Sequence, residues 1–285
     1  MFFHNCIIFT IILLLSTSIT QASDLAKEKR WAEQVVDAIF DGEPVTLKDG
    51  ELGFLAIFTP SSTSNSADAA IILHGLGVHP DWDQVVRPLR TGLPENGWAT
   101  LSLQMPILAN GIGYEEYAPL FKEVPGRIEA GIKYLQDHGT KRVVIISHSL
   151  GAAMGAYYLA NNQPDPVKGF VAIGMSGGGK STVMDNVMLL KSIHVPVLDL
   201  YGEIDLDSVL SSANQRRQSI ESRKIPASSK RSMQIMVPGA DHFFDAQNEV
   251  LYKEDHTWLG CLKCKKSFNQ DEVTAIRQLK WIFLA

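Results

Sequence analysis

From residue 69 onward, short apolar segments alternate with longer amphipathic ones. The apolar segments are rich in β-branched residues and predict buried strands at Ala69–Leu73, Ala99–Leu103, Arg142–Ile146, Gly169–Ile173, Val197–Leu200 and Met233–Met236. Hydrophobic residues at helical spacing predict intervening helices at roughly Asp83–Leu93, Tyr117–His138, Leu150–Asn161, Ser181–Ser192 and Ser208–Ser222. This alternation is typical of a mostly parallel central sheet with helices on both faces, and it places the chain in the α/β class.

The flanking segments complete this layout. They predict a first helix, a hairpin that turns at Lys48-Asp49-Gly50 and a last helix, at Leu25–Phe40, Pro44–Leu47 with Leu52–Phe58, and Glu272–Phe283. Pro125 is expected to break or kink the helix in which it falls, because proline removes a backbone donor. The largely polar stretch Gln247–Asn269 has no clear periodicity and receives no assignment.

Length and charge limit the possible organisation and partners. The chain has 285 residues, 45% of them hydrophobic and 20% charged, which suits one large α/β domain of the usual size, roughly 250 residues. No internal repeat or linker divides it. The formal net charge of −5 gives no support to nucleic-acid binding, which usually shows a basic stripe, or to binding at anionic membrane surfaces.

The N-terminal segment differs from the rest of the chain. Residues 1–22 contain no Lys, Arg, Asp or Glu, and Ile7–Leu15 is almost all apolar. Thr20 and Ala22 form a small-x-small cleavage site, so the segment predicts a secretory signal peptide, although it lacks the usual basic residue near its start. The alternative is an uncleaved anchor, but the apolar run is short of the about 20 residues that span a bilayer. The prediction is therefore a signal peptide at 1–22, a single domain at 23–285, a periplasmic or secreted location and no stable membrane insertion.

Removal of the signal peptide would also remove Cys6 and leave Cys261 and Cys264. A pair of cysteines in an oxidising compartment favours a local disulfide, with two free thiols as the alternative. A redox role would need a thioredoxin-like unit, which the sequence does not show. A metal site with His256 would need four visible ligands, so no metal is expected.

Ser149 lies where an expected apolar strand meets an expected helix of small residues, within residues 143–153. A sharp strand-to-helix bend exposes such a hydroxyl and directs it toward the unpaired N–H groups of the helix start. The crowded turn needs small neighbours, and Gly151 meets this need, while Ser147 occupies the place that glycine usually takes. The pattern predicts Ser149 as a nucleophile and the N–H of Leu150 as an oxyanion donor.

A second turn follows the strand Ala69–Leu73, in the run His74-Gly75-Leu76-Gly77. Glycines after a strand let the backbone turn tightly and aim an N–H inward. The N–H of Leu76 is therefore predicted as the second oxyanion donor. The alternative is an ordinary strand-end turn with a structural His74.

Two further loops would supply the groups that activate a serine. Asp205 follows the strand Val197–Leu200 and would orient an imidazole, although other acids in this segment compete with it, namely Asp199, Glu203 and Asp207. His242 follows the strand Met233–Met236 and would act as the general base. His148 adjoins the serine, but its side chain is expected to diverge from it. Other histidines have weaker cases, and Asp241 is expected to be a loop residue.

The order Ser149, Asp205, His242 resembles that of the α/β-hydrolase superfamily, from about Ala69 to the C-terminus. The resemblance rests on four motifs that each follow a strand, at His74–Gly77, Ser147–Gly151, Gly202–Asp205 and Gly239–His242. It implies an α/β-hydrolase fold, a triad of those three residues, the oxyanion donors Leu76 and Leu150, and no cofactor. The segment Leu93–Ser102 is similar to one in a group of uncharacterised exported bacterial proteins of this fold.

These residues together predict an exported serine hydrolase, resembling a carboxylesterase or thioesterase, that acts on a small-molecule ester through an acyl-enzyme. Pro106–Tyr117 is expected to overhang the pocket and to leave room for a small or medium acyl group. Amides and peptides remain alternative substrates. The alternative function is a non-catalytic binding protein on the same scaffold, because a fold alone does not establish activity.

Overall fold

A computed structural model describes residues 22–64, 66–223 and 231–263. The predicted signal peptide therefore lies outside the described residues except for its last residue. Cys264 and the expected helix Glu272–Phe283 also lie outside the described residues. No described helix has the length and apolar character needed to cross a membrane.

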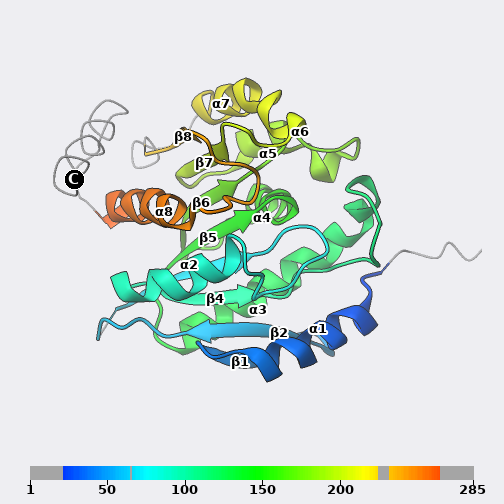
Figure 1. Ribbon diagram of the computed structural model, residues 1–285, viewed down its shortest axis with the longest axis vertical. Coiled ribbons are helices and arrows are strands. Elements are labelled where there is room, and N and C mark those ends of the chain that lie inside the picture. The colour runs from blue at the N-terminus through cyan, green and yellow to red at the C-terminus, as the bar shows by residue number, and fades with distance from the viewer. Residues whose placement is uncertain (1–21, 65, 224–230, 264–285) are drawn as a thin grey trace, which may run out of the picture.

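The centre of the molecule is an eight-stranded sheet in the order β1-β2-β4-β3-β5-β6-β7-β8 (Figure 1). The strands are β1 Glu43–Asp49, β2 Leu52–Thr59, β3 Asp68–Leu73, β4 Ala99–Leu103, β5 Arg142–His148, β6 Val167–Ile173, β7 Val197–Gly202 and β8 Met233–Val237. β1 and β2 form the predicted antiparallel hairpin, and β2 also runs antiparallel to β4. All pairings from β4 to β8 are parallel, so their carboxyl ends share one edge of the sheet.

Helices cover both faces of this sheet (Figure 1). They are α1 Leu25–Ala38, α2 Val86–Gly92, α3 Val124–Asp137, α4 Leu150–Asn161, α5 Asn186–Ser192, α6 Asp207–Leu210, α7 Ala213–Glu221 and α8 Asn248–Lys263. Neighbouring residues of a strand enter opposite hydrophobic clusters: Ile71 packs in the cluster that includes α3 and α4, and Ile72 packs in the one that includes α2 and α8. This two-sided burial explains why the strands read as continuous apolar runs.

Some helices are shorter than the sequence predicts. The expected helix Tyr117–His138 is a 3₁₀ segment, η2 (Glu115–Glu123), followed by α3. Pro125 stands in the first turn of α3, where a missing N–H costs nothing, so the break falls just before it. Three other expected helices are trimmed or divided in the same way, with short 3₁₀ turns at Leu93–Asn96 and Thr182–Met184.

The stretch Gln247–Asn269, which received no assignment, contains the helix α8. Its buried face follows helical spacing but includes a carboxyl among the apolar residues Leu251, Trp258, Leu259 and Leu262. That residue is Asp255, which is fully buried and whose carboxyl oxygens have no hydrogen-bond partner among the residues that the structure describes. A charged residue in the middle of the apolar stripe hides the periodicity from sequence reading.

Replacing Asp255 by leucine is expected to stabilise the protein, by about 1–3 kcal/mol at neutral pH, because a buried polar group without a partner opposes folding. Burial raises the pKa of Asp255 well above its usual value. As pH rises above about 4, the unfolded chain loses this proton while the folded chain keeps it, so the penalty grows with pH. Urea unfolding at acidic and neutral pH should therefore show a gain that is larger at neutral pH.

The exposed Glu249 on the same helix provides the control. Glu249→Leu is expected to change the unfolding free energy by less than about 0.5 kcal/mol at either pH. A loss of stability in Asp255→Leu at neutral pH would contradict the prediction.

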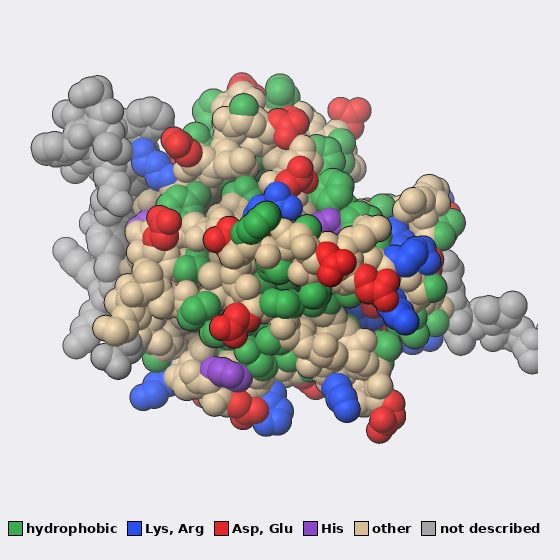
Figure 2. Space-filling view, turned by 60° about the horizontal axis from the view of Figure 1, so that its bottom comes forward, with side chains coloured by type: hydrophobic (Ala, Val, Ile, Leu, Met, Phe, Trp, Pro, Cys, Tyr) green, Lys and Arg blue, Asp and Glu red, His purple; other side chains and the backbone are tan. Residues whose placement is uncertain are grey.

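Charged side chains of both signs are interspersed with hydrophobic patches on the face shown in Figure 2. This mixed pattern agrees with the modest formal net charge of −5.

Candidate active site

Ser149 lies between the end of β5 and the start of α4, at the carboxyl edge of the sheet. Its backbone has φ 55° and ψ −120°, a conformation that a side chain with a Cβ rarely adopts. Two backbone hydrogen bonds hold it: the Ser149 N–H donates to Ile173 O at 2.9 Å, and Ala152 N–H donates to Ser149 O at 2.9 Å. The structure thus contains the predicted sharp turn, with the serine at its apex.

Glycines bring the loop after β3 close to this turn. A Cβ on Gly151 would lie 2.4 Å from His74 O, so only glycine fits there. A Cβ on Gly75 would lie 3.3 Å from Ser149 Cβ, which shows how near the two loops approach. Ser147 is tolerated at the usual glycine position because Gly155 leaves space for its hydroxyl, which would lie 2.8 Å from a Cβ there.

The structure brings Ser149, His242 and Asp205 together, although they come from three separate loops. His242 Nε2 lies 3.0 Å from Ser149 Oγ, and His242 Nδ1 lies 2.6 Å from Asp205 Oδ1. With Nδ1–H donating to the carboxylate, Nε2 is free to accept the serine proton. This is the arrangement of nucleophile, base and orienting acid that acyl transfer requires.

Asp205 is held as a carboxylate by its surroundings. Its oxygens also accept hydrogen bonds from Gly202 N–H at 3.2 Å and Leu206 N–H at 2.8 Å. Burial by itself would raise the pKa of Asp205, but the hydrogen bond and charge of His242, together with the two backbone donors, lower the pKa overall. The group therefore remains ionised near neutral pH and can stabilise a protonated His242.

The competing acids have other roles. Asp199 is fully buried within β7 and pairs with Arg216 Nε at 2.9 Å. Glu203 accepts a hydrogen bond from Gly239 N–H at 2.8 Å, and Asp207 begins α6 as an exposed residue. Of the acids that the sequence proposed, Asp205 is the one in contact with His242. Asp241 is a loop residue, as expected, and its carboxylate accepts hydrogen bonds from nearby backbone N–H groups.

His74 has the structural role that the sequence left as an alternative. It is buried, its Nε2 accepts a hydrogen bond from Met105 N–H at 2.9 Å, and its Nδ1–H donates to Gly75 O at 2.8 Å. Burial lowers the pKa of His74 to about 3, so the ring is neutral. It ties the glycine loop to the end of β4.

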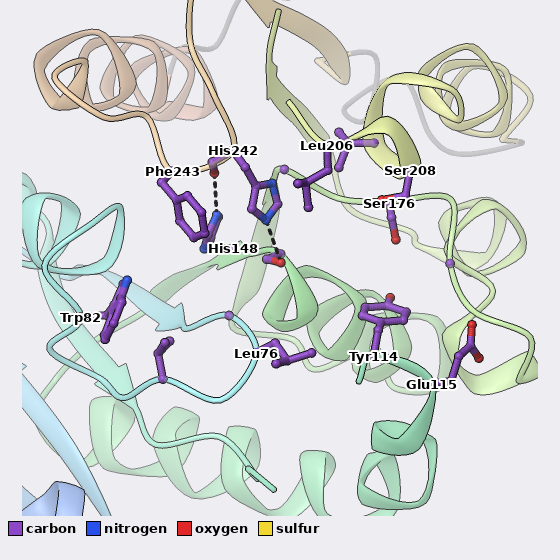
Figure 3. A pocket seen from close by; sticks show the side chains of 16 residues that line it. Leu76, Trp82, Tyr114, Glu115, His148, Ser176, Leu206, Ser208, His242 and Phe243 are labelled. Atoms are coloured by element: carbon purple, nitrogen blue, oxygen red, sulfur yellow. Dashed lines mark hydrogen bonds between the residues drawn. The ribbon is translucent and has the colours of Figure 1, made fainter. Parts of the chain in front are cut away.

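The side chain of His148, which was expected to diverge from that of Ser149, contacts the loop that carries His242. Its Nε2–H donates to His242 O at 2.9 Å, and the two rings lie 4.9 Å apart (Figure 3). Burial, followed by the neighbouring His242, lowers the pKa of His148 to about 4, which keeps it neutral. His148 therefore positions the loop that carries His242. Nothing in the sequence indicated this positioning role other than the place of His148 next to Ser149.

A cavity of about 480 Å³ opens at Ser149. Its walls are mainly apolar and include Leu76, Val78, Trp82, Leu206, Val209 and Phe243. In Figure 3, Phe243 and His148 lie on one side of His242, whereas Tyr114 and Glu115 lie on the other. Tyr114 and Glu115 come from the segment that was expected to overhang the pocket, while Tyr117 is buried and accepts a hydrogen bond from Leu108 N–H.

The described residues contain no group of three or more His, Cys, Asp or Glu side chains placed to hold a metal ion.

Comparisons with known proteins connect this site to a family and a fold. The sequence model of a family described as "Protein of unknown function (DUF3530)" matches residues 17–119 and 115–242. No curated protein matches the sequence.

Solved structures with the same fold include several hydrolases. A dienelactone hydrolase from Anabaena variabilis has a TM-score of 0.62 and 16% identity, covering 77% of this chain and 97% of that one. Est1E from Butyrivibrio proteoclasticus has a TM-score of 0.59 and 13% identity, covering 77% and 98%. An esterase from Pyrococcus furiosus has a TM-score of 0.60 and 16% identity, covering 78% and 92%. These similarities show an α/β-hydrolase fold, as the sequence predicts.

Proposed function

Because the chain belongs to the family described as "Protein of unknown function (DUF3530)" and has an α/β-hydrolase fold, we propose that it is a serine hydrolase acting on ester bonds. One observation carries the proposal: the continuous contact from Ser149 Oγ through His242 to Asp205, at 3.0 and 2.6 Å. The esterase from Pyrococcus furiosus among the structural neighbours supports the choice of an ester over other acyl compounds.

The mechanism follows from the positions of these atoms. Ser149 Oγ attacks the ester carbonyl carbon while His242 Nε2 takes its proton, and Asp205 stabilises the resulting imidazolium. His242 then gives this proton to the leaving alcohol oxygen, and the acyl group remains on Ser149. A water molecule then gives a proton to His242 as its oxygen attacks the acyl carbon. The bond to Ser149 Oγ breaks and releases the acid, and His242 returns the proton to Oγ, which regenerates the serine.

We assign the developing oxyanion to the N–H groups of Leu76 and Leu150. Leu150 is the first residue of α4, so its N–H has no acceptor within the helix and lies at the positive end of the helix dipole. Leu76 follows Gly75, whose close approach to Ser149 places this loop beside the nucleophile. Loss of one such donor typically slows the reaction about 100-fold or more.

The cavity suggests the size of the acyl group. Its volume of about 480 Å³ lies in the lower part of the usual range for ligand sites, roughly 300–1,000 Å³, and its walls are mainly apolar. A compact apolar acyl group fits this space, in line with the dienelactone hydrolase and the ferulic acid bound to Est1E among the structural neighbours. We therefore propose a small or medium acyl group, joined to an alcohol or a thiol.

A series of p-nitrophenyl esters of increasing chain length tests both the activity and this preference. The expected kcat/KM is highest for short and medium acyl chains and falls by about 10-fold or more for long chains, which exceed the cavity. A steady rise up to the longest chain would contradict the assigned acyl size. Failure of the folded protein to react with a fluorophosphonate would instead favour the non-catalytic alternative.

A further inference from the structure

The chain passes from exposed to buried at the predicted cleavage site. Ala22 is exposed, whereas the next residue, Ser23, is only 9% exposed. Ser23 Oγ–H donates to Glu123 Oε2 at 2.8 Å, and Ser23 N–H donates to Glu123 Oε1 at 3.3 Å. One carboxylate thus receives both polar groups of the residue that would begin the mature chain.

This carboxylate belongs to a cluster of charged side chains. The fully buried Arg127 makes two hydrogen bonds to Glu28, at 2.9 and 3.1 Å, and lies farther from Glu123, at 3.8 Å. Two carboxylates therefore share one guanidinium. The nearby Lys27 ammonium donates to Leu108 O at 2.9 Å. The pKa of Glu28 is raised overall. Burial is the main cause and the negative charge of Glu123 contributes, whereas Arg127 acts to lower this pKa.

We propose that Glu123 is the binding site for the N-terminal ammonium that forms when the peptide bond between Ala22 and Ser23 is cut. A peptidase of the export machinery would hydrolyse this bond with one water molecule, leaving a carboxylate on Ala22 and a protonated amine on Ser23. The nitrogen already lies 3.3 Å from Glu123 Oε1, so the hydrogen bond of an amide becomes an ion pair. The added positive charge lies beside a carboxylate that shares its guanidinium, that of Arg127, with Glu28.

The anchored residue leads directly into helix α1. Asp24 N–H donates to Ile107 O at 2.7 Å, and the Asp24 carboxylate caps α1 by accepting from Lys27 N–H at 2.9 Å. These bonds fix the position and direction of the first turn of α1 relative to Ser23. The ion pair would therefore secure the start of this helix.

Helix α1 in turn supports one wall of the cavity. Its Trp31 ring lies 4.2 Å from the His79 ring and 6.3 Å from Trp82, a residue that lines the cavity at Ser149. The N-terminal ion pair therefore links processing of the chain to the segment between β3 and α2. This inference does not depend on the proposed ester hydrolysis, and its test uses no activity measurement.

The experiment first determines the N-terminal residue of exported protein by mass spectrometry, where Ser23 is expected and another first residue would overturn the proposal. Thermal unfolding then compares protein that begins at Ser23 with protein that retains Gln21 and Ala22, each with Glu123 and with Glu123→Gln. The form that begins at Ser23 should melt about 2–4 °C higher, and Glu123→Gln should abolish this difference. An equal effect of Glu123→Gln on both forms would reduce the contact to an ordinary hydrogen bond and overturn the proposal.

Glu129→Gln is the matched control, because Glu129 is an exposed glutamate on α3, the helix that begins directly after Glu123. It should leave the difference in melting temperature between the two forms unchanged.

A second measurement is independent of stability. The N-terminal amine of the native form should react with an acylating reagent several-fold more slowly than that of Glu123→Gln, since an ion-paired ammonium holds its proton more firmly. Equal reactivity in the two proteins would contradict the ion pair.

Discussion

Replacing Ser149 by alanine is expected to lower kcat/KM for p-nitrophenyl esters by about 10⁴-fold or more, to a residual rate close to that of the oxyanion donors alone. The reason is that the Oγ at 3.0 Å from His242 is the atom that would bond to the acyl carbon. Alanine adopts the same backbone conformation as serine, so the turn should persist and the protein should stay folded. Steady-state kinetics and labelling with a fluorophosphonate measure the loss.

Ser192→Ala is the control for this prediction, because Ser192 is exposed at the end of α5 and distant in sequence from the site. This variant should retain native kinetics and native labelling. Labelling of Ser149→Ala at the native rate would place the nucleophile at another residue and refute the assignment.

The second large effect is expected for Asp205→Asn, with a fall in kcat of about 10³- to 10⁴-fold. An amide at this position can donate to the imidazole, which favours the tautomer with the proton on Nε2. That tautomer cannot accept the proton of Ser149. The variant also loses the negative charge that stabilises a protonated His242, while Gly202 N–H, which donates to the other oxygen, Oδ2, keeps an acceptor oxygen in place there.

Asp207→Asn is the matched control, because this acid lies two positions along the chain and is exposed. It should change kcat by less than about two-fold, as for surface substitutions away from a site. If Asp207→Asn and Asp205→Asn lost activity equally, the acid of the triad would need reassignment. Circular dichroism of each variant would confirm that the fold is intact.

The parts of the fold that the sequence predicted well are those in which local pattern and tertiary packing agree. Strand β4 and helix α4 have the predicted boundaries, because an apolar run and a run of small residues each end at a turn. Helix α8 was not predicted, because Asp255 interrupts its apolar face in a way that only burial in the fold explains. The division before α3 depends on a proline that suits a helix start as well as a break.

The candidate site could be predicted as far as chain order and strand ends allow. Ser149 and His242 follow strands that end at the same edge, so their meeting follows from a parallel sheet. The choice of Asp205 over Asp199 required the observed contact, since both lie near the end of one strand. The role of His148 depends on the path of the loop that carries His242, and no local pattern encodes that path. The shape of the cavity could not be predicted from local sequence patterns either, because its walls come from segments that are distant in the sequence.

The strained backbone conformation of Ser149 limits how this protein could evolve toward greater thermal stability. Glycine at this position would relieve the backbone strain that a φ of 55° imposes on serine. Selection for thermal stability alone would therefore favour replacing the serine. The most reactive position is thus also one where robustness and turnover are in direct opposition. Thermal hardening of this scaffold should therefore draw on changes far from the turn, such as those in α8.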